Sequence, residues 1–375
     1  MKILVIHASA GTGHLKAAEA IEQGFRLSSD KNFQVQWANS LDYTSPFFKW
    51  LYEQMYLFMI MRTPRFWGLG YYLLDFPAMR PLTDMTRRVF NGINTMKLCQ
   101  YLCEENFDCA ISTHFLANEV ISYLKWRKKI KTKLIAVITD LGAHCLWISP
   151  QVQMYVVGSG TTKEDLLNRG VPESKILVLG IPISLKFSAP KDPLQLRLKF
   201  GLRHGVFTLL LIGGGFGVGP IQEIVDELSP LPIQLIVICG KNASLYETIV
   251  GKSLNSSCLV KPLGYVDNID EWMAVSDCVI TKSGGLTVSE ALASGLAMII
   301  ISPIPGQERK NCEVLVRAGA AVEVRSPSEV NHLVREFMRQ PDHLQRMRKR
   351  ARELAHPDSA KNIAQWVLQK GASLG

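Results

Sequence analysis

The sequence predicts an α/β protein with two domains, each built on a parallel sheet that helices cover on both faces. Short, near-continuous apolar runs alternate with helical patterns in both halves of the chain, as is typical of buried parallel strands joined by crossover helices. A polar stretch, residues 184–205, separates the two series. The length of 375 residues is enough for two such domains.

The first series opens with an apolar strand at Lys2–Ala8. Gly11-Thr12-Gly13-His14 then predicts a tight loop, and apolar residues at helical spacing predict a helix over Leu15–Leu27. Further strands of this half are expected at Phe33–Ala38, Cys109–Ser112, Leu134–Thr139, Met154–Val157 and Ile176–Leu179.

The second series begins with a strand at Val206–Ile212, which runs into the glycine-rich sequence GGGFGVGPI, residues 213–221. From His332 the pattern predicts helix as far as Gln369. Further strands are expected at Gln234–Cys239, Cys258–Lys261, Cys278–Thr281, Ala297–Ser302 and Ala321–Val324. These patterns divide the chain into an N-terminal domain 1–183, a linker 184–205, a second domain 206–345 and a C-terminal helical segment 346–375.

The net charge of +9 is compatible with anionic membranes, anionic substrates or nucleic acid. Few Lys and Arg runs interleave with aromatics as they do in single-strand binders, so we expect no nucleic-acid partner. The basic run 346–352 is expected to be a solvated helix face.

Cysteine usage fits a reducing cytosol, because the eight cysteines include no C-x-x-C pair. Cys99 and Cys103 have helical spacing but no pair of histidines to complete a zinc site, so we expect no metal. Lys2 leads directly into an apolar strand, so we expect no signal peptide. No apolar run reaches about 18 residues, so we expect no transmembrane helix.

Residues 46–82 break the strand–helix alternation. They gather many of the aromatic and Met residues of the chain, with Lys49, Arg62, Arg65 and Arg80 among them. One interpretation is a pair of core helices. The other is an interfacial element that places apolar side chains in the lipid boundary and cations at the headgroups. The residues expected to contact membrane or a lipid acceptor are Trp50, Phe58, Arg62, Arg65, Phe66 and Trp67.

The stretch 280–311 predicts a nucleotide-sugar site. Gly284 and Gly285 leave main-chain N–H groups uncovered at a helix N-terminus, where a diphosphate can bind. Glu290 lies about one turn further on, within reach of a pair of sugar hydroxyls. Gln307 and Glu308 follow the next strand, at the edge where open parallel sheets bind ligands.

The glycine-rich loop that contains Gly214 and Gly215 has two interpretations. Its spacing is not G-x-G-x-x-G, and the chain has no G-x-x-x-x-G-K-[ST] sequence, so neither a nicotinamide site nor a P-loop is expected. The glycines either permit tight strand–helix packing or let a ligand approach the backbone.

Three histidines follow predicted strands. A neutral His14 at a helix start could accept a proton from an alcohol, or could only cap the helix. Asp140 and His144 could orient an acceptor hydroxyl, but a structural loop is the alternative. Thr113-His114 has the same ambiguity.

Taken together, these motifs resemble the lipid glycosyltransferases of glycosyltransferase family 28, in particular the monogalactosyl- and processive glucosyl-diacylglycerol synthases. A more distant similarity is to the transferase that adds N-acetylglucosamine to lipid I. The sequences that carry the resemblance run in order along the chain: AGTGHLKAAEAI (10–21), VITDLGAHCLW (137–147), LGIPI (179–183), GGGFGVGPI (213–221), VICGKN (237–242), LGYVDNIDEWMAVSDCVITKSGGLTVSEA (263–291) and PGQERKN (305–311).

The resemblance implies a GT-B fold, in which two Rossmann-like domains face a cleft and the C-terminal helices pack back toward the N-terminal domain. It places the acceptor and membrane contacts on residues 1–183 and the UDP-sugar on 206–345. It also implies an inverting transfer with no cofactor and no metal. The expected product is a β-glycosyldiacylglycerol made at the cytoplasmic face of a membrane, by a peripheral enzyme that contacts anionic lipids.

The resemblance also implies roles for individual residues. His14 and Asp140 would be catalytic, and Glu290 would bind the ribose. Gln307 and Glu308 would contact the hexose. The residues expected along the diphosphate are Gly214, Gly215, Ser283, Gly284, Gly285, Leu286 and Thr287.

Several alternatives stay open on the sequence alone. The acceptor could be another lipid-linked molecule, such as an undecaprenyl-linked sugar. The chain could instead be a non-hydrolysing UDP-sugar epimerase, or a non-catalytic UDP-sugar-binding membrane protein. The sequence does not choose between UDP-glucose and UDP-galactose, or between one sugar and several added to diacylglycerol.

Overall fold

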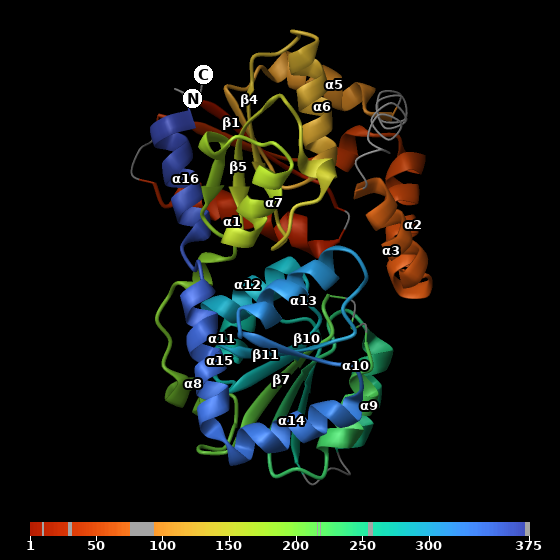
Figure 1. Cartoon of the computed structure of the whole chain (residues 1–375), viewed down its shortest axis with the longest axis vertical. Helices are drawn as coiled ribbons and strands as arrows, with labels where there is room; N and C mark the ends of the chain where they lie inside the picture. Colours follow the sequence, from red (N-terminus) through yellow and green to blue (C-terminus); the bar gives the residue numbers. More distant parts are fainter. Residues whose placement is uncertain are drawn as a thin grey trace. The chain divides into compact units, whose positions relative to one another are not determined.

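Two six-stranded sheets, each with parallel neighbours throughout, organise the chain (Figure 1). The computed structural model describes residues 1–9, 11–28, 32–75, 94–215, 217, 219–253 and 258–371, with the backbone alone at 56, 57, 60 and 61. The contacts divide the chain into two compact units. One comprises Met1–Leu185, Pro305–Gln307 and His356–Gly375, and the other comprises Lys186–Ile304 and Glu308–Ala355.

The sheet of the first unit has the order β2-β1-β3-β4-β5-β6. Chain direction along the sheet therefore reverses between β1 and β3, which is the switch point where open α/β sheets bind ligands. Its strands are β1 (Lys2–His7), β2 (Gln34–Asn39), β3 (Cys109–Ser112), β4 (Lys133–Val137), β5 (Val152–Val157) and β6 (Ile176–Val178).

Helices cover both faces of the first sheet, and apolar strand residues are buried beneath them. The C-terminal helix α16 packs on α1 in this unit, and Ile363 and Val367 of α16 join the core that includes Ile3 and Val5. The helices are α1 (Thr12–Arg26), α2 (Pro46–Arg62), α3 (Pro64–Asp75), α5 (Met96–Glu105), α6 (Phe115–Trp126), α7 (Gly160–Asn168) and α16 (Ser359–Lys370), with 3₁₀ turns η1 (Ser40–Tyr43), η3 (Cys145–Trp147) and η4 (Glu173–Lys175).

The sheet of the second unit has the order β12-β11-β10-β7-β8-β9, so its switch point lies between β7 and β10. This is the strand order of the doubly wound dinucleotide-binding fold. Its strands are β7 (Thr208–Ile212), β8 (Gln234–Ile238), β9 (Leu259–Leu263), β10 (Cys278–Thr281), β11 (Ala297–Ile301) and β12 (Ala321–Val324).

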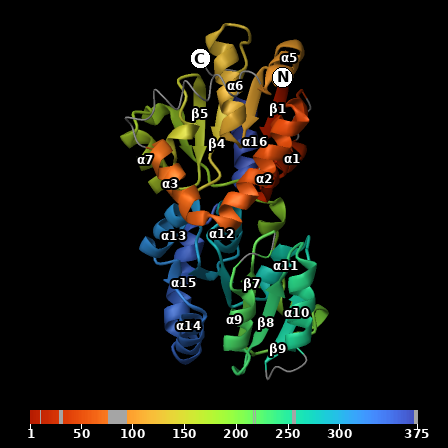
Figure 2. The ribbon, with the colours of Figure 1, turned by 90° about the vertical axis from the view of Figure 1, so that its right-hand side faces the viewer.

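A second apolar core fills the space between this sheet and its helices. Figure 2 shows β7, β8 and β9 beside α9 and α10. The helices are α8 (Pro193–Lys199), α9 (Ile221–Leu228), α10 (Ala243–Ser253), α11 (Ile269–Ala274), α12 (Gly285–Ala293), α13 (Gln307–Arg317), α14 (Pro327–Arg339) and α15 (Pro341–Leu354). The 3₁₀ turn η5 (Leu185–Phe187) lies where the chain passes from one unit to the other.

The alternation of strands and helices predicted for both halves is confirmed, and every predicted strand is present. Two predicted boundaries were wrong. The helix expected from Leu15 begins at Thr12, directly after the N-cap Gly11, whose backbone at φ 93° is not helical. The helix expected over 332–369 is three helices, because Pro341 and Pro357 interrupt it.

The segment with clustered aromatics is a helix pair, α2 and α3, seen side by side in Figure 1. Phe48 of α2 is buried, but Phe47, Trp50, Phe58 and Phe66 are between 58% and 74% exposed. The helix pair therefore presents apolar side chains to solvent, which is uncommon for an ordinary surface. Arg62 and Arg65 are exposed and Trp67 is partly exposed, whereas Arg80 and the rest of 76–82 lie outside the described residues.

Within the described ranges, none of the helices combines the length and the apolar character that crossing a membrane demands. All eight cysteines are free thiols, and six of them are buried.

Candidate active site

The switch point of the first sheet brings His14 and Thr113 together. His14 lies in the first turn of α1, directly after β1, and Thr113 directly follows β3. Because β1 and β3 are hydrogen-bonded neighbours, their carboxyl ends meet at one edge. His14 Nδ1 lies 2.7 Å from the carbonyl oxygen of Thr113, and the Thr113 hydroxyl donates to the carbonyl oxygen of His14 at 2.9 Å.

These contacts assign the tautomer of His14. A carbonyl oxygen only accepts hydrogen bonds, so Nδ1 carries the proton of the neutral ring and Nε2 carries the lone pair. The hydroxyl oxygen of Thr139, after β4, lies 3.1 Å from the same Nδ1. The ring is therefore held in the form in which Nε2 can accept a proton.

The charge state of His14 follows from its surroundings. Burial and, to a smaller extent, nearby His7 lower the pKa of the imidazole to about 4, although the hydrogen bond to the Thr113 carbonyl acts in the opposite direction. The ring is thus neutral at physiological pH, as a general base must be.

His114 and His144 are used structurally. Nδ1 of His114 accepts the N–H of Leu116 and caps α6. Nδ1 of His144 accepts the N–H of Leu146, and Nε2 lies 2.9 Å from the carbonyl oxygen of Tyr71. For these two histidines the structural interpretation accounts for the contacts, and the proposed pairing of His144 with an acceptor hydroxyl is not needed.

Asp140 lies in the loop after β4, one residue beyond Thr139, and its side chain is partly exposed. Thr139 contacts His14, so the loop that carries Asp140 leaves the sheet beside the imidazole. Asp140 is also close enough to Tyr71 that its charge helps to raise the pKa of that phenol, although burial is the larger cause.

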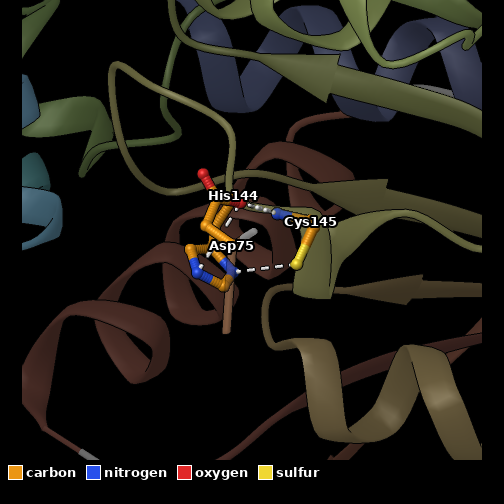
Figure 3. A group of neighbouring side chains, drawn as sticks. All are labelled: Asp75, His144 and Cys145. Carbon is orange, nitrogen blue, oxygen red and sulfur yellow. Dashed lines mark hydrogen bonds and ion pairs between the residues drawn. The ribbon is translucent and has the colours of Figure 1, made fainter. Parts of the chain in front are cut away.

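A second polar group joins the end of α3 to the same loop. Figure 3 shows Asp75, His144 and Cys145 together. Asp75 Oδ1 accepts the N–H of Cys145 at 2.9 Å, and Oδ2 lies 2.7 Å from Arg169 Nη2. Burial opposes ionisation of Asp75, but the hydrogen bonds from Arg169 and Cys145 and the charges nearby lower its pKa.

The donor atoms of this group have the spacing of a metal site. However, Asp75 is paired with a guanidinium, His144 is bonded through both ring nitrogens, and the thiol of Cys145 donates to the Leu74 carbonyl at 3.0 Å. These residues therefore fit a structural junction better than a cation site.

The switch point of the second sheet carries both glycine-rich turns. The loop 213–219 follows β7, and Ser283-Gly284-Gly285 follows β10, the neighbour of β7 in the sheet. Both turns therefore emerge at one edge of the sheet, where nucleotides bind in doubly wound folds. Phe216 and Val218 of the first loop lie outside the described residues.

The glycines of the first loop are required for different reasons, some by packing and one by open space beside its backbone. A Cβ on Gly213 would lie 2.4 Å from Ile221 Cδ1, and one on Gly217 would lie 2.6 Å from the Cys239 carbonyl oxygen, so both are required by packing. Gly214 has φ +71° and no atom within 4 Å of its would-be Cβ. Space is open beside Gly214, as approach of a ligand to the backbone requires.

The second turn leads into α12. Gly284 is the N-cap and provides no side-chain cap, and the first turn contains Gly285, Leu286 and Thr287. Their main-chain N–H groups precede the start of intrahelical bonding, so an anion can accept from them. Ser283 is buried, and its hydroxyl donates to the Glu308 carbonyl at 2.6 Å, so its side chain fixes the turn.

The acidic residues of the predicted sugar site lie on two helices of this unit. Glu290 is in the second turn of α12 and is partly exposed. Glu308 Oε2 accepts the N–H of Ile304 at 2.9 Å, and Oε1 lies 3.9 Å from a would-be Cβ on Gly284, so this carboxylate faces the N-terminus of α12. Burial raises its pKa, against the effect of Lys282. Gln307 is the first residue of α13.

Sequence reasoning missed the residues that hold these groups in place. Thr113 was named only together with His114, and Thr139 only as the last residue of a predicted strand; their positions at strand ends are the signal that could have identified their contacts with His14. Asn311, whose amide donates to the Ser283 carbonyl at 2.9 Å, lies in the PGQERKN motif but had no assigned role. Nothing in the local sequence distinguishes Asp75 or Arg169.

Comparison with known proteins identifies the family. Residues 14–183 match the family "Monogalactosyldiacylglycerol (MGDG) synthase", and residues 208–363 match the "Glycosyltransferase family 28 C-terminal domain". A "Processive diacylglycerol beta-glucosyltransferase" of Bacillus thuringiensis (strain Al Hakam) is 30% identical over 98% of this chain and 94% of its own.

Solved structures agree on the fold. Acinetobacter baumannii MurG has a TM-score of 0.64 at 15% identity, covering 98% of this chain and 99% of its own. The UDP-GlcNAc 2-epimerase of Neisseria meningitidis, bound to UDP-GlcNAc, has a TM-score of 0.61 at 14% identity, covering 98% and 100%. At these identities, the likeness extends to the two-domain architecture alone.

The fold and the family matches define a UDP-sugar-dependent glycosyltransferase of the GT-B class. The chain belongs to glycosyltransferase family 28, among its lipid glycosyltransferases.

Proposed function

We propose that this enzyme transfers a hexose from UDP-glucose or UDP-galactose to diacylglycerol, with inversion, to give a β-glycosyldiacylglycerol. The observation that carries the proposal is the neutral imidazole of His14, whose Nδ1 is held by Thr113 so that Nε2 is the basic nitrogen. The matching family and the relatives, a monogalactosyldiacylglycerol synthase family and diacylglycerol beta-glucosyltransferases, support the acceptor class and both candidate hexoses.

In the proposed reaction, the primary hydroxyl oxygen of diacylglycerol attacks the anomeric carbon of the donor. A carbon–oxygen bond forms there, the bond from that carbon to the β-phosphate oxygen breaks, and UDP leaves with the electron pair. His14 Nε2 takes the hydroxyl proton. Attack opposite to an α-linked UDP gives the β-glycoside. Asp140 would orient the hydroxyl or stabilise the imidazolium that forms.

The loops that follow β7 and β10, with the helices α12 and α13, would bind the donor. The N–H groups of Gly285, Leu286 and Thr287 at the start of α12, with the backbone at Gly214 and Gly215, would bind the diphosphate and stabilise the charge that develops on it. Glu290 would accept from the ribose hydroxyls. Gln307 and Glu308 would contact the hexose. Ser283 would contribute through its backbone, since its hydroxyl bonds to the protein.

The acceptor is a lipid, so the enzyme must reach a membrane surface. The exposed aromatic side chains of α2 and α3, with Arg62 and Arg65 among them, support a peripheral attachment at the cytoplasmic face. Anionic headgroups would attract these cations, in keeping with the net charge of +9.

The test is an assay with radiolabelled UDP-glucose and UDP-galactose, each supplied with diacylglycerol vesicles, followed by chromatography of the lipids. The expected result is a labelled glycosyldiacylglycerol from one donor, and its sugar-chain length shows whether transfer is repeated. If label appears only in another lipid, that lipid and not diacylglycerol is the acceptor. An altered sugar released without an acceptor would identify an epimerase, and UDP-sugar binding without turnover would identify a non-catalytic binding protein.

A further inference from the structure

We propose that the α2–α3 helix pair positions the two loops of the acceptor side, and that Glu53 and Asp75 are the positioning residues that link the helices to those loops. The inference deepens the proposed function and rests on it, because it concerns the placement of a lipid acceptor at His14.

The first link joins α2 to the loop between β1 and α1. The hydroxyl of Ser9, five residues before His14, donates to Glu53 Oε1 at 2.5 Å. Asn39, at the end of β2, holds Ser9 from the other side, since its Oδ1 accepts the N–H of Ser9 at 3.1 Å. Lys49 of α2 adds an ion pair to Asp42 at 2.5 Å. Ser9, five residues before His14, is thus held partly by α2.

The second link joins α3 to the loop that carries Asp140. Asp75, the last residue of α3, accepts the N–H of Cys145 and pairs with Arg169. Two main-chain carbonyls in the final turns of α3 also accept hydrogen bonds from this loop. His144 Nε2 donates to the carbonyl of Tyr71, and the Cys145 thiol donates to the carbonyl of Leu74. Side chain and main chain of the loop are therefore both bonded to α3.

The same two helices carry the exposed apolar side chains, so the surface proposed to bind lipid and the loops proposed to bind the hydroxyl are connected directly. Attachment of α2 to the domain does not depend on Glu53, because Phe48 already packs with Ala8, Leu41 and Leu116 in a separate apolar cluster. The Glu53 carboxylate therefore fixes the position of Ser9 and is not needed to hold α2 on the domain.

The experiment compares the wild type with Glu53→Ala and Asp75→Asn in the vesicle assay, and measures labelled glycolipid formed per UDP released. This ratio counts the outcome of each turnover, so a smaller folded fraction leaves it unchanged. With the hydroxyl misplaced, water competes better for the donor, and we expect the ratio to fall by about tenfold, with the KM for the UDP-sugar and the vesicle affinity unchanged. Glu104 is an exposed carboxylate of α5 that accepts from Gln100, so Glu104→Ala is the matched control and keeps the wild-type ratio.

Arg169 provides an independent variant of the second link. Arg169→Lys keeps the ion pair to Asp75 and should retain the ratio, whereas Arg169→Gln should lower it as Asp75→Asn does. A wild-type ratio in Glu53→Ala and Asp75→Asn, with the wild type active, overturns the inference and leaves the proposed function standing. A wild type that forms no glycolipid overturns the proposed function, and the inference with it.

Discussion

His14 and Thr113 hold each other by two reciprocal contacts: Nδ1 of His14 with the Thr113 carbonyl, and the Thr113 hydroxyl with the His14 carbonyl. The two residues are 99 positions apart in the sequence and meet because β1 and β3 are neighbours. A histidine that only capped α1 would need no such partner, and the described contacts of its ring leave Nε2 as the nitrogen for chemistry.

Removing the imidazole should stop transfer without preventing donor binding. In His14→Ala we expect kcat to fall by about a hundredfold to ten-thousandfold, the usual contribution of general base catalysis. The affinity for UDP, which the second unit is proposed to bind, should stay at the wild-type value. The measurement is glycolipid formation at saturating donor and lipid, beside calorimetric titration with UDP.

The matched control for this variant is His332→Ala, since His332 is exposed on α14 and remote in sequence from every proposed site residue. It should retain wild-type turnover. Near-wild-type kcat in His14→Ala would remove the imidazole from the mechanism and leave Asp140 as the candidate base.

The pH dependence of activity should reflect the lowered pKa of His14. A pKa of about 4 means that the base is neutral from about pH 5 upward. We expect kcat/KM to be level between pH 6 and 8 and to decline only as pH approaches 4, whereas an ordinary histidine near 6.5 would already lose activity at pH 6.

Stability should depend on pH in the same direction. The unfolded chain binds a proton at His14 below pH 6.5, but the folded chain does so only near pH 4. The contribution of this histidine to the free energy of unfolding is therefore full above pH 6.5 and is lost as pH falls to 4. If kcat/KM instead fell toward low pH with a midpoint near pH 6.5, the imidazole of His14 would be more solvated than its contacts indicate.

The sequence predicted the fold well because the signals for it are local. Runs such as Ile3–Ile6 and Met298–Ile301 are apolar along their whole length, which distinguishes strands buried on both faces from strands with one wet face. The helix boundaries were less accurate, since Pro341 and Pro357 divide a pattern whose apolar period continues across them.

The glycine turns and His14 were also identifiable, because glycine and histidine directly after a strand are local features. The residues that hold them were not. Asp75 contacts Arg169, which is 94 positions away, and Thr139 contacts His14, which is 125 positions away. Only the strand order brings the two residues of each pair together. The same reason explains the ambiguity of His114 and His144, whose cap contacts depend on backbone geometry that a sequence pattern does not contain.

Gly214 provides a test of the open space at the first glycine-rich loop, residues 213–219. Gly214→Ala should cost about 1 kcal/mol of stability, because an L-residue is strained at φ +71°. It should also weaken UDP binding, since the added methyl group occupies the space proposed for the diphosphate. Gly205→Ala is the matched control, with φ +72° and equally open surroundings away from the turn.

The two variants should unfold at similar temperatures and differ in UDP affinity. Gly217→Ala, whose Cβ would lie 2.6 Å from the Cys239 carbonyl, should lose considerably more stability than either. Equal UDP affinity in Gly214→Ala and Gly205→Ala would place the diphosphate elsewhere.

Glu290 should account for a distinct part of donor affinity. A carboxylate that accepts from sugar hydroxyls contributes about 1.5–3 kcal/mol, so Glu290→Ala should weaken UDP by roughly ten- to a hundredfold. Binding of inorganic diphosphate should be unaffected, because that ligand has no ribose for Glu290 to contact. Glu313→Ala, an exposed carboxylate on α13, should bind UDP as the wild type does. Unchanged UDP affinity in Glu290→Ala would show that the ribose lies on another residue.

The exposed aromatic side chains of the helix pair should determine binding to membranes. Phe66, 74% exposed on α3, would leave water on contact with a lipid surface, so Phe66→Ser should weaken vesicle binding by about tenfold, as loss of one buried aromatic predicts. Leu198 on α8 is 81% exposed and controls for loss of a surface apolar group, so Leu198→Ser should bind vesicles as the wild type does.

Added salt should weaken binding to anionic vesicles more than to neutral ones, because Arg62 and Arg65 act through screened charge. Sedimentation with vesicles of both compositions measures all three effects. Equal losses in Phe66→Ser and Leu198→Ser would mean that the helix pair is not the membrane contact, and binding indifferent to salt would remove the anionic headgroups from the proposal.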